Sequence, residues 1–273
     1  MTENEFILMD RITKIRSIIT KYGVENFTIS FSGGKDSTVL SYLIDECFPG
    51  NAIPRLYADT GIDMRMVHDF VLDMAKKDSR IVILKPTVPV KPMLEREGYP
   101  FKSKNHSMLV WRYQTHNEMP ESVKSYLGLT SKWGQRLQCP QKLKYQFTPE
   151  FKQKLKVSDH CCLRMKEDVL QKYSKEHDKP YSIIGTMREE GGRREHLQCL
   201  SFKGKKLFAF QPLAMCTKEW EDWYILLRGI HICDIYKPPY SFKRTSCVGC
   251  PFSINLEKEL STFRKFFPET QQG

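Results

Sequence analysis

Apolar residues in the first third of the chain follow two patterns, helical spacing and short continuous runs. Residues 6–22 carry isoleucines at roughly helical spacing and are followed by Gly23, which predicts a helix and its end. The other elements expected in this region are strands at 27–31, 53–58 and 81–84 and a helix at 62–76. Strands that alternate with helices predict a parallel sheet with helices on its faces.

The pattern changes after the third expected strand. Pro86, Pro89 and Pro92 interrupt the alternation. Residues 102–133 then predict a helical insertion, and the basic residues 141–156 predict a connecting arm. The remaining expected elements are a helix at 162–176, a strand at 181–185, a β-hairpin with arms at 197–202 and 206–210, a helix at 218–228 and an irregular segment at 232–246. The expected fold class is therefore α/β, a doubly wound and mostly parallel sheet with an inserted helical region.

This order of elements predicts two domains. An α/β domain would cover residues 1–210 and include the helical insertion at about 86–156. A C-terminal segment over residues 211–273 would carry a Cys-x-x-Cys motif, Cys247 to Cys250. A chain of 273 residues is long enough to bury a full core in the first of these domains.

A glycine-rich motif separates the first expected strand from a helix whose first turns are expected at 39–43. It reads Ser32-Gly33-Gly34-Lys35-Asp36-Ser37-Thr38. Glycines let backbone N–H groups converge on phosphate oxygens, and a helix N-terminus favours negative charge. The spacing differs from Walker A, which has four residues between its glycine and its Gly-Lys pair. The motif therefore predicts a phosphate site on which Lys35 supplies a cation, with a plain polar turn as the alternative.

Two more polar segments follow expected strands. Asp59 comes directly after the second strand, and ligands of parallel sheets bind beyond the carboxyl ends of strands. We expect Asp59 to coordinate Mg²⁺ or to bond to the ligand, with a helix N-cap as the alternative. Arg188, Arg193 and Arg194 follow the strand at 181–185, and guanidinium groups bind phosphate or sulfate in a bidentate way. A solvated run of charge is the alternative for these arginines.

Charge and composition narrow the class of partner. The chain carries 43 Lys and Arg against 32 Asp and Glu, a net charge of +11. This excess favours an anionic partner, a nucleotide, a nucleic acid or both, over a merely basic surface. No apolar stretch approaches the length of a membrane span, and residues 1–10 are too acidic for a signal peptide. We therefore expect a cytoplasmic protein with no membrane partner.

Cysteines give the second informative pattern. The chain has nine of them, an odd number that favours thiol or metal chemistry over a disulfide framework. Cys161 and Cys162 are adjacent, and Cys247 and Cys250 form the Cys-x-x-Cys motif. Four thiolates from two places could hold a tetrahedral zinc ion or an iron–sulfur cluster. Adjacent cysteines fit a 4Fe–4S cluster better, and Lys166 would offset its negative charge; zinc or free thiols are the alternatives.

Together these motifs resemble the phosphoadenosine phosphosulfate reductase family, from about Phe27 to the end of the chain. The glycine-rich motif is similar to the PP-loop of the ATP pyrophosphatase superfamily, which implies the adenine nucleotide α-hydrolase-like fold. The resemblance rests on residues 32–38, 59–61, 161–162 with Lys166, Gly185 with Arg188, 211–213 and 245–251. In relatives that reduce adenylyl sulfate, the double cysteine and the later Cys-x-x-Cys hold a 4Fe–4S cluster. The resemblance implies the same role for Cys161, Cys162, Cys247 and Cys250.

Two features depart from the reductases of this family. Those enzymes use a further cysteine near the C-terminus as the nucleophile on sulfur, and residues 251–273 contain no cysteine. Reductases also tend to have a degraded PP-loop, whereas the motif here is complete. A complete loop is closer to ATP-using relatives, such as the ATP sulfurylase small subunit and enzymes that insert sulfur into tRNA or the DNA backbone.

The resemblance therefore implies an adenylating enzyme of sulfur metabolism that releases pyrophosphate and passes sulfur to an acceptor. ATP or a related adenine nucleotide, with Mg²⁺, would bind to residues 32–38, Asp59, Arg188 and Arg193. Lys35, Asp36 and Arg188 are the expected catalytic residues. Nucleic acid is the candidate acceptor, and a cysteine desulfurase or thioredoxin-like reductant is the candidate protein partner. The alternative is a sulfonucleotide reductase that uses a thiol from elsewhere.

Overall fold

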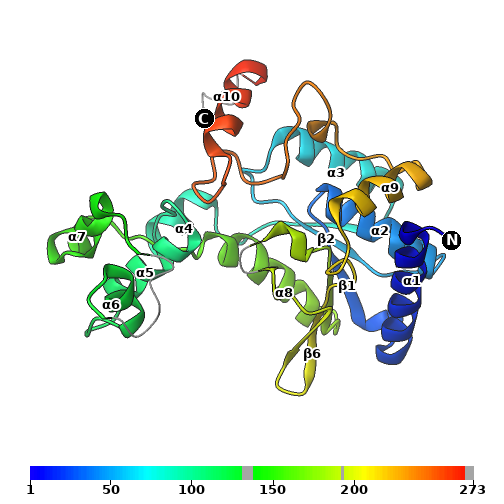
Figure 1. The fold of residues 1–273 in the computed structure, drawn as a ribbon, viewed down its shortest axis with the longest axis horizontal. Coiled ribbons are helices and arrows are strands. Elements are labelled where there is room, and N and C mark those ends of the chain that lie inside the picture. Colours follow the sequence, from blue (N-terminus) through cyan, green and yellow to red (C-terminus); the bar gives the residue numbers. More distant parts are fainter. Residues whose placement is uncertain (131–137, 192–193, 268–273) are drawn as a thin grey trace. The chain divides into compact units, whose positions relative to one another are not determined.

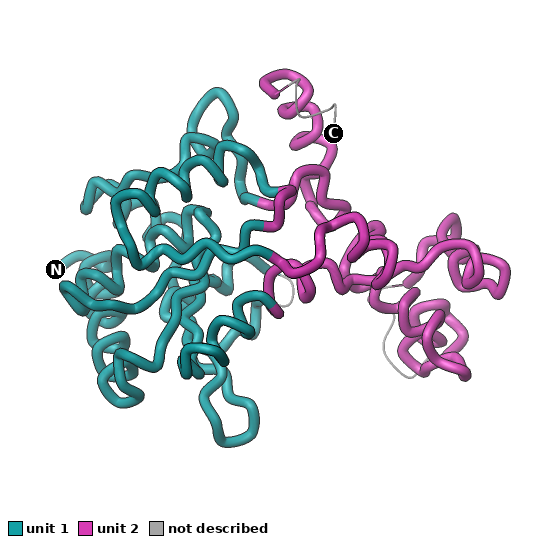
Figure 2. Tube along the Cα trace, turned by 180° about the vertical axis from the view of Figure 1, so that it is seen from behind, with its two compact units in different colours: residues 1–59, 63–85, 169–245 teal, residues 60–62, 86–168, 246–273 magenta. Residues whose placement is uncertain are grey.

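The computed structural model describes residues 1–130, 138–191 and 194–267. The chain divides into two compact units, coloured separately in Figure 2. Unit 1 comprises Met1–Asp59, Asp63–Lys85 and Val169–Thr245, and unit 2 comprises Thr60–Ile62, Pro86–Asp168 and Ser246–Gly273. Each unit is therefore built from segments that are far apart in the sequence. In the described ranges, no helix has the length and apolar content needed to cross a bilayer.

Unit 1 is organised around a six-stranded sheet in the order β3-β2-β1-β4-β6-β5. Figure 1 labels β1, β2 and β6 of this sheet. The strands are β1 (Phe27–Ser30), β2 (Arg55–Ala58), β3 (Ile81–Leu84), β4 (Tyr181–Ile184), β5 (Leu200–Lys203) and β6 (Lys206–Phe210). All neighbouring pairs run parallel except the hairpin of β5 and β6, which is antiparallel. This arrangement confirms the expected α/β fold class, a doubly wound and mostly parallel sheet.

The order of strands reverses at β1. From β1 the chain proceeds outward through β2 to β3, and β4 then returns to the opposite side of β1. Ile29 of β1 is paired in register with Ile183 of β4, and both side chains are fully buried. The loops that leave β1 and β4 therefore start beside each other, at the position where open α/β sheets bind their ligands.

Helices cover both sides of the sheet. Those assigned wholly or mainly to unit 1 are α1 (Glu3–Tyr22), η1 (Val24–Asn26), α2 (Lys35–Cys47), α3 (Arg65–Lys77), α8 (Asp168–Glu176), η4 (Arg188–Glu190), α9 (Lys218–Arg228) and η6 (Asp234–Tyr236). The larger core joins α1, α2 and α9 to the sheet through fully buried side chains such as Ile15 and Leu40. A second core places Val71 of α3 against Phe31 and Tyr57. The sheet is thus buried on two faces, as a parallel sheet requires.

The N-terminal helix shows how local sequence sets an element. Thr2 and Glu5 form a capping box: the Thr2 side chain accepts from the Glu5 N–H, and Glu5 accepts from the Thr2 N–H. This box satisfies two of the unpaired N–H groups at the helix start. Gly23 ends the helix with a positive φ of 81°. The helix expected at 6–22 is confirmed and begins one turn earlier.

Unit 2 is mainly helical and has a core of its own. Its elements are α4 (Val90–Glu97), α5 (Lys104–Thr115), α6 (Glu121–Leu127), η2 (Gln141–Phe147), α7 (Pro149–Lys154), the π-helical turn η3 (Leu163–Glu167) and α10 (Leu256–Phe266). Val110 and Val123 are fully buried in this core. His106 is buried between two hydrogen-bond partners, the hydroxyl of Tyr126 at 3.0 Å and Oε1 of Gln146 at 2.8 Å. The helical insertion expected at 102–133 is confirmed over α5 and α6, whereas 131–133 lie outside the described residues.

The connecting arm expected at 141–156 is wrong. The structure has η2 and α7 there, and Gln146 and Phe147 are buried in unit 2. Thr148 caps α7 by accepting from the Phe151 N–H, and Pro149 stands at the first helical position, where its missing N–H costs nothing. These short helices were missed because most of their side chains are exposed lysines, so the sequence shows almost no spacing of apolar residues there.

Candidate functional site

The glycine-rich motif forms the turn between β1 and α2. Gly34 is the N-cap of α2, and no side chain of the described residues caps that helix. Ser32 Oγ accepts from the Gly34 N–H at 3.2 Å and lies 3.1 Å from Ser37 Oγ. The hydroxyls of Ser37 and Thr38 donate to the Gly34 carbonyl at 3.0 and 2.9 Å. The hydroxyls thus hold the loop in shape, while the start of a 13-residue helix stays free of a carboxylate cap.

Two glycines are required here by space. Gly33 has a positive φ of 67°, and a Cβ on it would lie 2.4 Å from Cγ2 of Val71. A Cβ on Gly185, which follows β4, would lie 2.9 Å from the carbonyl oxygen of Asp36. The backbone leaving β4 therefore touches the first turn of α2. The structure brings Gly185 and the glycine-rich motif into one site.

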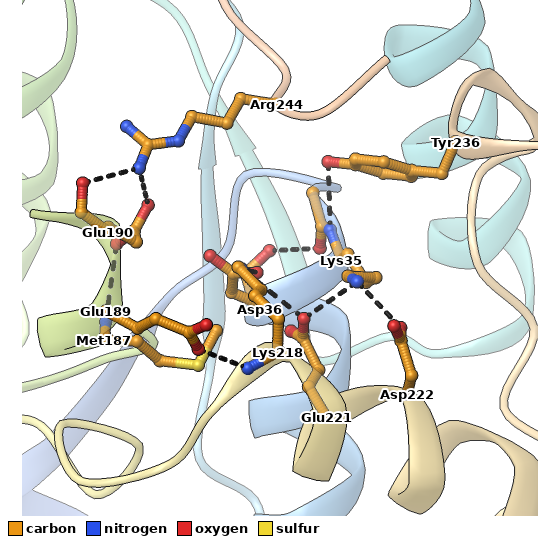
Figure 3. Close-up of polar contacts among 12 residues, drawn as sticks. Lys35, Asp36, Met187, Glu189, Glu190, Lys218, Glu221, Asp222, Tyr236 and Arg244 are labelled. Atoms are coloured by element: carbon orange, nitrogen blue, oxygen red, sulfur yellow. Dashed lines mark hydrogen bonds and ion pairs between the residues drawn. The ribbon is translucent and has the colours of Figure 1, made fainter. Parts of the chain in front are cut away.

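Lys35 is held by two carboxylates of α9 (Figure 3). Its Nζ lies 2.8 Å from Oδ1 of Asp222 and 3.0 Å from Oε2 of Glu221. Burial alone would lower the pKa of Lys35, but Asp222 and Glu221 outweigh it and raise the pKa above its ordinary value. The Lys35 backbone N–H donates to the hydroxyl of Tyr236 at 3.1 Å. Burial raises the pKa of that hydroxyl to about 12, so it stays protonated.

Asp36 and Glu221 share a second lysine, Lys218, at the start of α9. Its Nζ lies 2.7 Å from Oδ1 of Asp36 and 3.4 Å from Oε2 of Glu221 (Figure 3). Glu221 is fully buried, and its Oε1 has no hydrogen-bond partner among the described residues. Burial, followed by the neighbouring Asp36, raises the pKa of Glu221 to about 8. The site thus contains a buried carboxyl group whose pKa lies above the ordinary value of a glutamate.

Sequence reasoning did not find this acidic and basic cluster on α9. One signal was available: Glu221 lies between Trp220 and Tyr224, which both face the core of unit 1. A charged residue on the buried stripe of a helix needs a partner of opposite charge. Only the fold could identify that partner as the PP-loop lysine, because Lys35 and Glu221 are far apart in the chain.

Asp59 lies at the carboxyl end of β2 and is mostly buried. Its backbone N–H donates to the Leu84 carbonyl at 2.8 Å. Its Oδ2 lies 3.6 Å from Nε2 of His68 and 3.8 Å from Nζ of Lys85. These contacts place Asp59 beside the side chains of His68 and Lys85, and its role toward Mg²⁺ stays a prediction.

The arginines after β4 contact other groups of the same chain. Arg188 donates from Nε to the Leu197 carbonyl at 2.6 Å. Arg194 pairs with Glu190 at 2.5 Å, and Arg244 donates to the Glu190 carbonyl at 3.0 Å. Arg193 lies outside the described residues. A role for Arg188 and Arg193 in binding an anion therefore stays a prediction.

The four predicted metal-ligating cysteines all belong to unit 2, and each is partly buried. The thiols of Cys161 and Cys162 interact electrostatically with each other and with Cys250. The Cys161 contact lowers the pKa of Cys162 to about 6 against the effect of burial, assisted by the ammonium groups of Lys104 and Lys166. Three of the four thiols are therefore neighbours in a positively charged environment.

The Cys-x-x-Cys motif forms a tight turn. The Cys250 N–H donates to the Cys247 carbonyl at 3.1 Å, and Gly249 has the positive φ of 66° that such a turn needs. The Val248 N–H donates to the Ile62 carbonyl at 2.8 Å, also within unit 2. Across the described ranges, no group of three or more His, Cys, Asp or Glu side chains is arranged to hold a metal ion. The cysteines are gathered but do not form a coordination sphere.

Comparisons with known proteins agree with the resemblance. A family model described as the phosphoadenosine phosphosulfate reductase domain matches residues 26–110 and 102–252. An uncharacterized protein of Methanocaldococcus jannaschii is 26% identical over 274 aligned residues, covering 95% of this chain and 52% of that protein. The chain therefore spans about half the length of this curated relative.

Two solved structures that align with most of this chain have been given enzyme names. A phosphoadenylyl-sulfate reductase from Candida auris, in complex with phosphate, aligns over 82% of this chain and 88% of its own, with 12% identity and a TM-score of 0.42. A U34-tRNA thiolase from Methanococcus maripaludis, with its [4Fe-4S] cluster, aligns over 98% of this chain and 81% of its own, with 16% identity and a TM-score of 0.44.

Proposed function

The chain belongs to the phosphoadenosine phosphosulfate reductase family, and from this we propose that it is an ATP-dependent adenylating enzyme that prepares an acceptor for sulfur transfer. The observation that carries the proposal is the complete PP-loop at the N-terminus of α2, with Lys35 at its first helical position. A loop of this kind suits a nucleotide with a pyrophosphate to release. A sulfonucleotide has no such group.

The nucleotide's phosphates would bind at the start of α2. The N-terminus of that helix carries a partial positive charge and has no side-chain cap among the described residues. Lys35 would turn from its carboxylate partners to the phosphates, and Asp59 would coordinate Mg²⁺ at the end of the neighbouring strand. Arg188 and Arg193 are the proposed further ligands of the phosphates. Gly185 supports this geometry because a side chain there would displace the first turn of α2.

The proposed reaction is nucleotidyl transfer. An acceptor oxygen attacks the α-phosphorus of ATP, the bond from that phosphorus to the bridging oxygen breaks, and pyrophosphate leaves with the electron pair. A persulfide on a donor protein then displaces AMP from the acceptor, and a thiol reductant cleaves the resulting S–S bond. In the first step Lys35 would stabilise the charge that develops on the leaving pyrophosphate, with Asp36 and Arg188 as the other proposed catalytic residues.

The cysteines of unit 2 fit a thiolate-bound centre by the chemistry of their donor set. Soft thiolates suit iron–sulfur clusters and zinc, and the neighbouring Lys104 and Lys166 would offset the negative charge of a cluster. Cys161, Cys162, Cys247 and Cys250 would hold the proposed 4Fe–4S cluster. Such a cluster supplies an iron that can bind a sulfur species.

Nucleic acid is the proposed acceptor. The net charge of +11 favours a polyanion. The η2–α7 region of unit 2 adds five exposed lysines against one glutamate, Glu150. These lysines are Lys142, Lys144, Lys152, Lys154 and Lys156. Tyr145, in the same region, is half exposed and could stack on an unpaired base.

The test is release of pyrophosphate from ATP, measured with total transfer RNA or single-stranded DNA as the acceptor probe. We expect release that depends on the probe and falls about 100-fold in Lys35→Ala. Lys76→Ala, on an exposed lysine of α3, is the matched control and should behave as wild type. Release without any probe, or none under any condition, would contradict the proposal. Sulfite formed from adenylyl sulfate would instead establish the reductase.

A further inference from the structure

Glu221 stands out among the buried groups because it touches the PP-loop lysine and has no assigned role. We propose that Glu221 is the proton-binding residue of the nucleotide site: in its ionised form it holds Lys35 in the ligand-free chain, and it takes up a proton when Lys35 turns to the phosphates. This inference rests on the proposed function, since it requires a nucleotide at the loop. It assigns to α9 a part in nucleotide binding that sequence motifs did not indicate.

The contacts around Glu221 form a small closed set. From α2 it faces Lys35 at 3.0 Å and the carboxylate of Asp36, and from its own helix it faces Lys218 at 3.4 Å. Asp222 lies on the far side of Lys35, 2.8 Å from its Nζ. On the α1 side, Arg11 lies near Cys216 but donates to Asp10 and to the Pro212 carbonyl. Two lysines, Lys35 and Lys218, are therefore paired with three carboxylates.

Removing Lys35 from this set affects the three carboxylates differently. Asp222 has 64% of its side chain exposed, so water can solvate its charge. Asp36 keeps Lys218, which lies closer to it than to Glu221. Glu221 is fully buried, and its Oε1 already has no partner among the described residues. A buried carboxylate that loses its cation becomes neutral by binding a proton, because an unpaired charge is unfavourable there.

The direction of the pH dependence follows. Burial and Asp36 place the pKa of Glu221 at about 8 while Lys35 is still in contact, and loss of Lys35 raises it further. Below that pH Glu221 is already protonated, so ATP binding takes up few protons. Above it, binding takes up close to one proton, and affinity falls by up to about tenfold for each further pH unit.

The experiment is calorimetric titration of the full chain with α,β-methylene ATP and Mg²⁺, in buffers of different ionisation enthalpy at pH 6.5 and pH 9. At pH 9 the terminal phosphate has no proton of its own to exchange. We expect proton uptake near zero at the lower pH and between about one half and one at the higher pH. Glu221→Gln keeps the shape but cannot titrate, so uptake at pH 9 should vanish and affinity should become nearly independent of pH.

Asp222→Asn is the matched control, because it removes the exposed partner of Lys35 and should keep wild-type uptake at pH 9. Binding without uptake at pH 9 in the wild type, or unchanged uptake in Glu221→Gln, overturns the inference. If Glu221→Gln does not fold, the infrared difference spectrum of the wild type decides. Nucleotide binding at pH 9 must then produce the carbonyl stretch of a protonated carboxylic acid. Absence of any binding would instead count against the proposed function.

Discussion

At the scale of residues, the site depends on close backbone contact as much as on charged groups. Gly185 leaves no room for a side chain, since a Cβ there would lie 2.9 Å from the carbonyl oxygen of Asp36. The contact is with backbone, which cannot turn aside as a flexible side chain would. The first turn of α2 must shift if this position gains a methyl group.

Gly185→Ala should therefore weaken ATP binding at least tenfold and lower the free energy of unfolding by about 1–3 kcal/mol, the usual effect of overpacking. Calorimetry and urea denaturation measure the two effects. Gly204→Ala is the control, because its Cβ meets nothing within 4 Å and only the positive φ of 64° is strained. That variant should lose some stability and keep its ATP affinity. Equal affinity in both variants would refute a role for the contact at Gly185.

The glycine-rich motif could be found in the sequence, whereas the α9 residues that contact it could not, for a physical reason. The glycine-rich motif can be recognised from local sequence, because a strand, two glycines and a helix start are consecutive in the chain. The place of Glu221 and Lys218 in the site depends on their contacts with Lys35 and Asp36, which are far away in sequence. The spacing of apolar residues predicts that a helix is amphipathic, but it does not predict which residues its polar side chains will contact.

At the scale of elements, the strands at 81–84 and 206–210 and the helix at 218–228 have the bounds expected from the sequence. Apolar runs and capping signals set these elements locally. The error at 141–156 arose because five lysines mask two short helical segments whose one buried side, around Phe147, is narrow. That region now forms a folded basic surface rather than a linker.

Replacing three lysines of this surface, Lys142, Lys144 and Lys152, by glutamine should weaken binding of single-stranded RNA and DNA. Each lost phosphate contact should reduce the slope of log affinity against log salt by about 0.7. Fluorescence anisotropy at several salt concentrations measures it. The control removes the same charge from exposed positions of unit 1, Lys76, Lys77 and Lys172. An equal effect in both triple variants would show non-specific attraction only.

The buried histidine of α5 predicts acid sensitivity in unit 2. Burial lowers the pKa of His106 below its ordinary value of 6.5, so the folded state favours the neutral ring. The stabilisation is present above the unfolded pKa and is lost as pH falls through the folded one. The protection factors of amide hydrogens in α5 and α6, which correct for the pH dependence of intrinsic exchange, should therefore fall below about pH 6, while those in α1 and α2 stay unchanged. His177→Gln, at an exposed position, should leave this difference unchanged, and an equal fall of the protection factors in both units would contradict it.

At the scale of the whole molecule, the two candidate centres belong to different units. The PP-loop lies in unit 1, and the four cysteines lie in unit 2. Anaerobic purification should yield about four irons and four sulfides per chain, lost in the double variant Cys247→Ser, Cys250→Ser. ATP binding should survive in that variant, because unit 1 keeps its own core. Cys199→Ser should retain the cluster, and one zinc without sulfide in the wild type would refute it.

The order of synthesis gives the division into units a further meaning. Unit 2 draws its parts from three separated stretches, and the last of them begins at Ser246. A ribosome therefore exposes Cys161 and Cys162 well before it has made Cys247 and Cys250. The sheet of unit 1 has all its strands by Phe210, and α9, which completes its larger core, ends at Arg228, before Cys247 is made. Insertion of the proposed cluster would then be a late event in the life of the nascent chain, and cells short of iron would accumulate chains with a folded unit 1 and no cluster in unit 2.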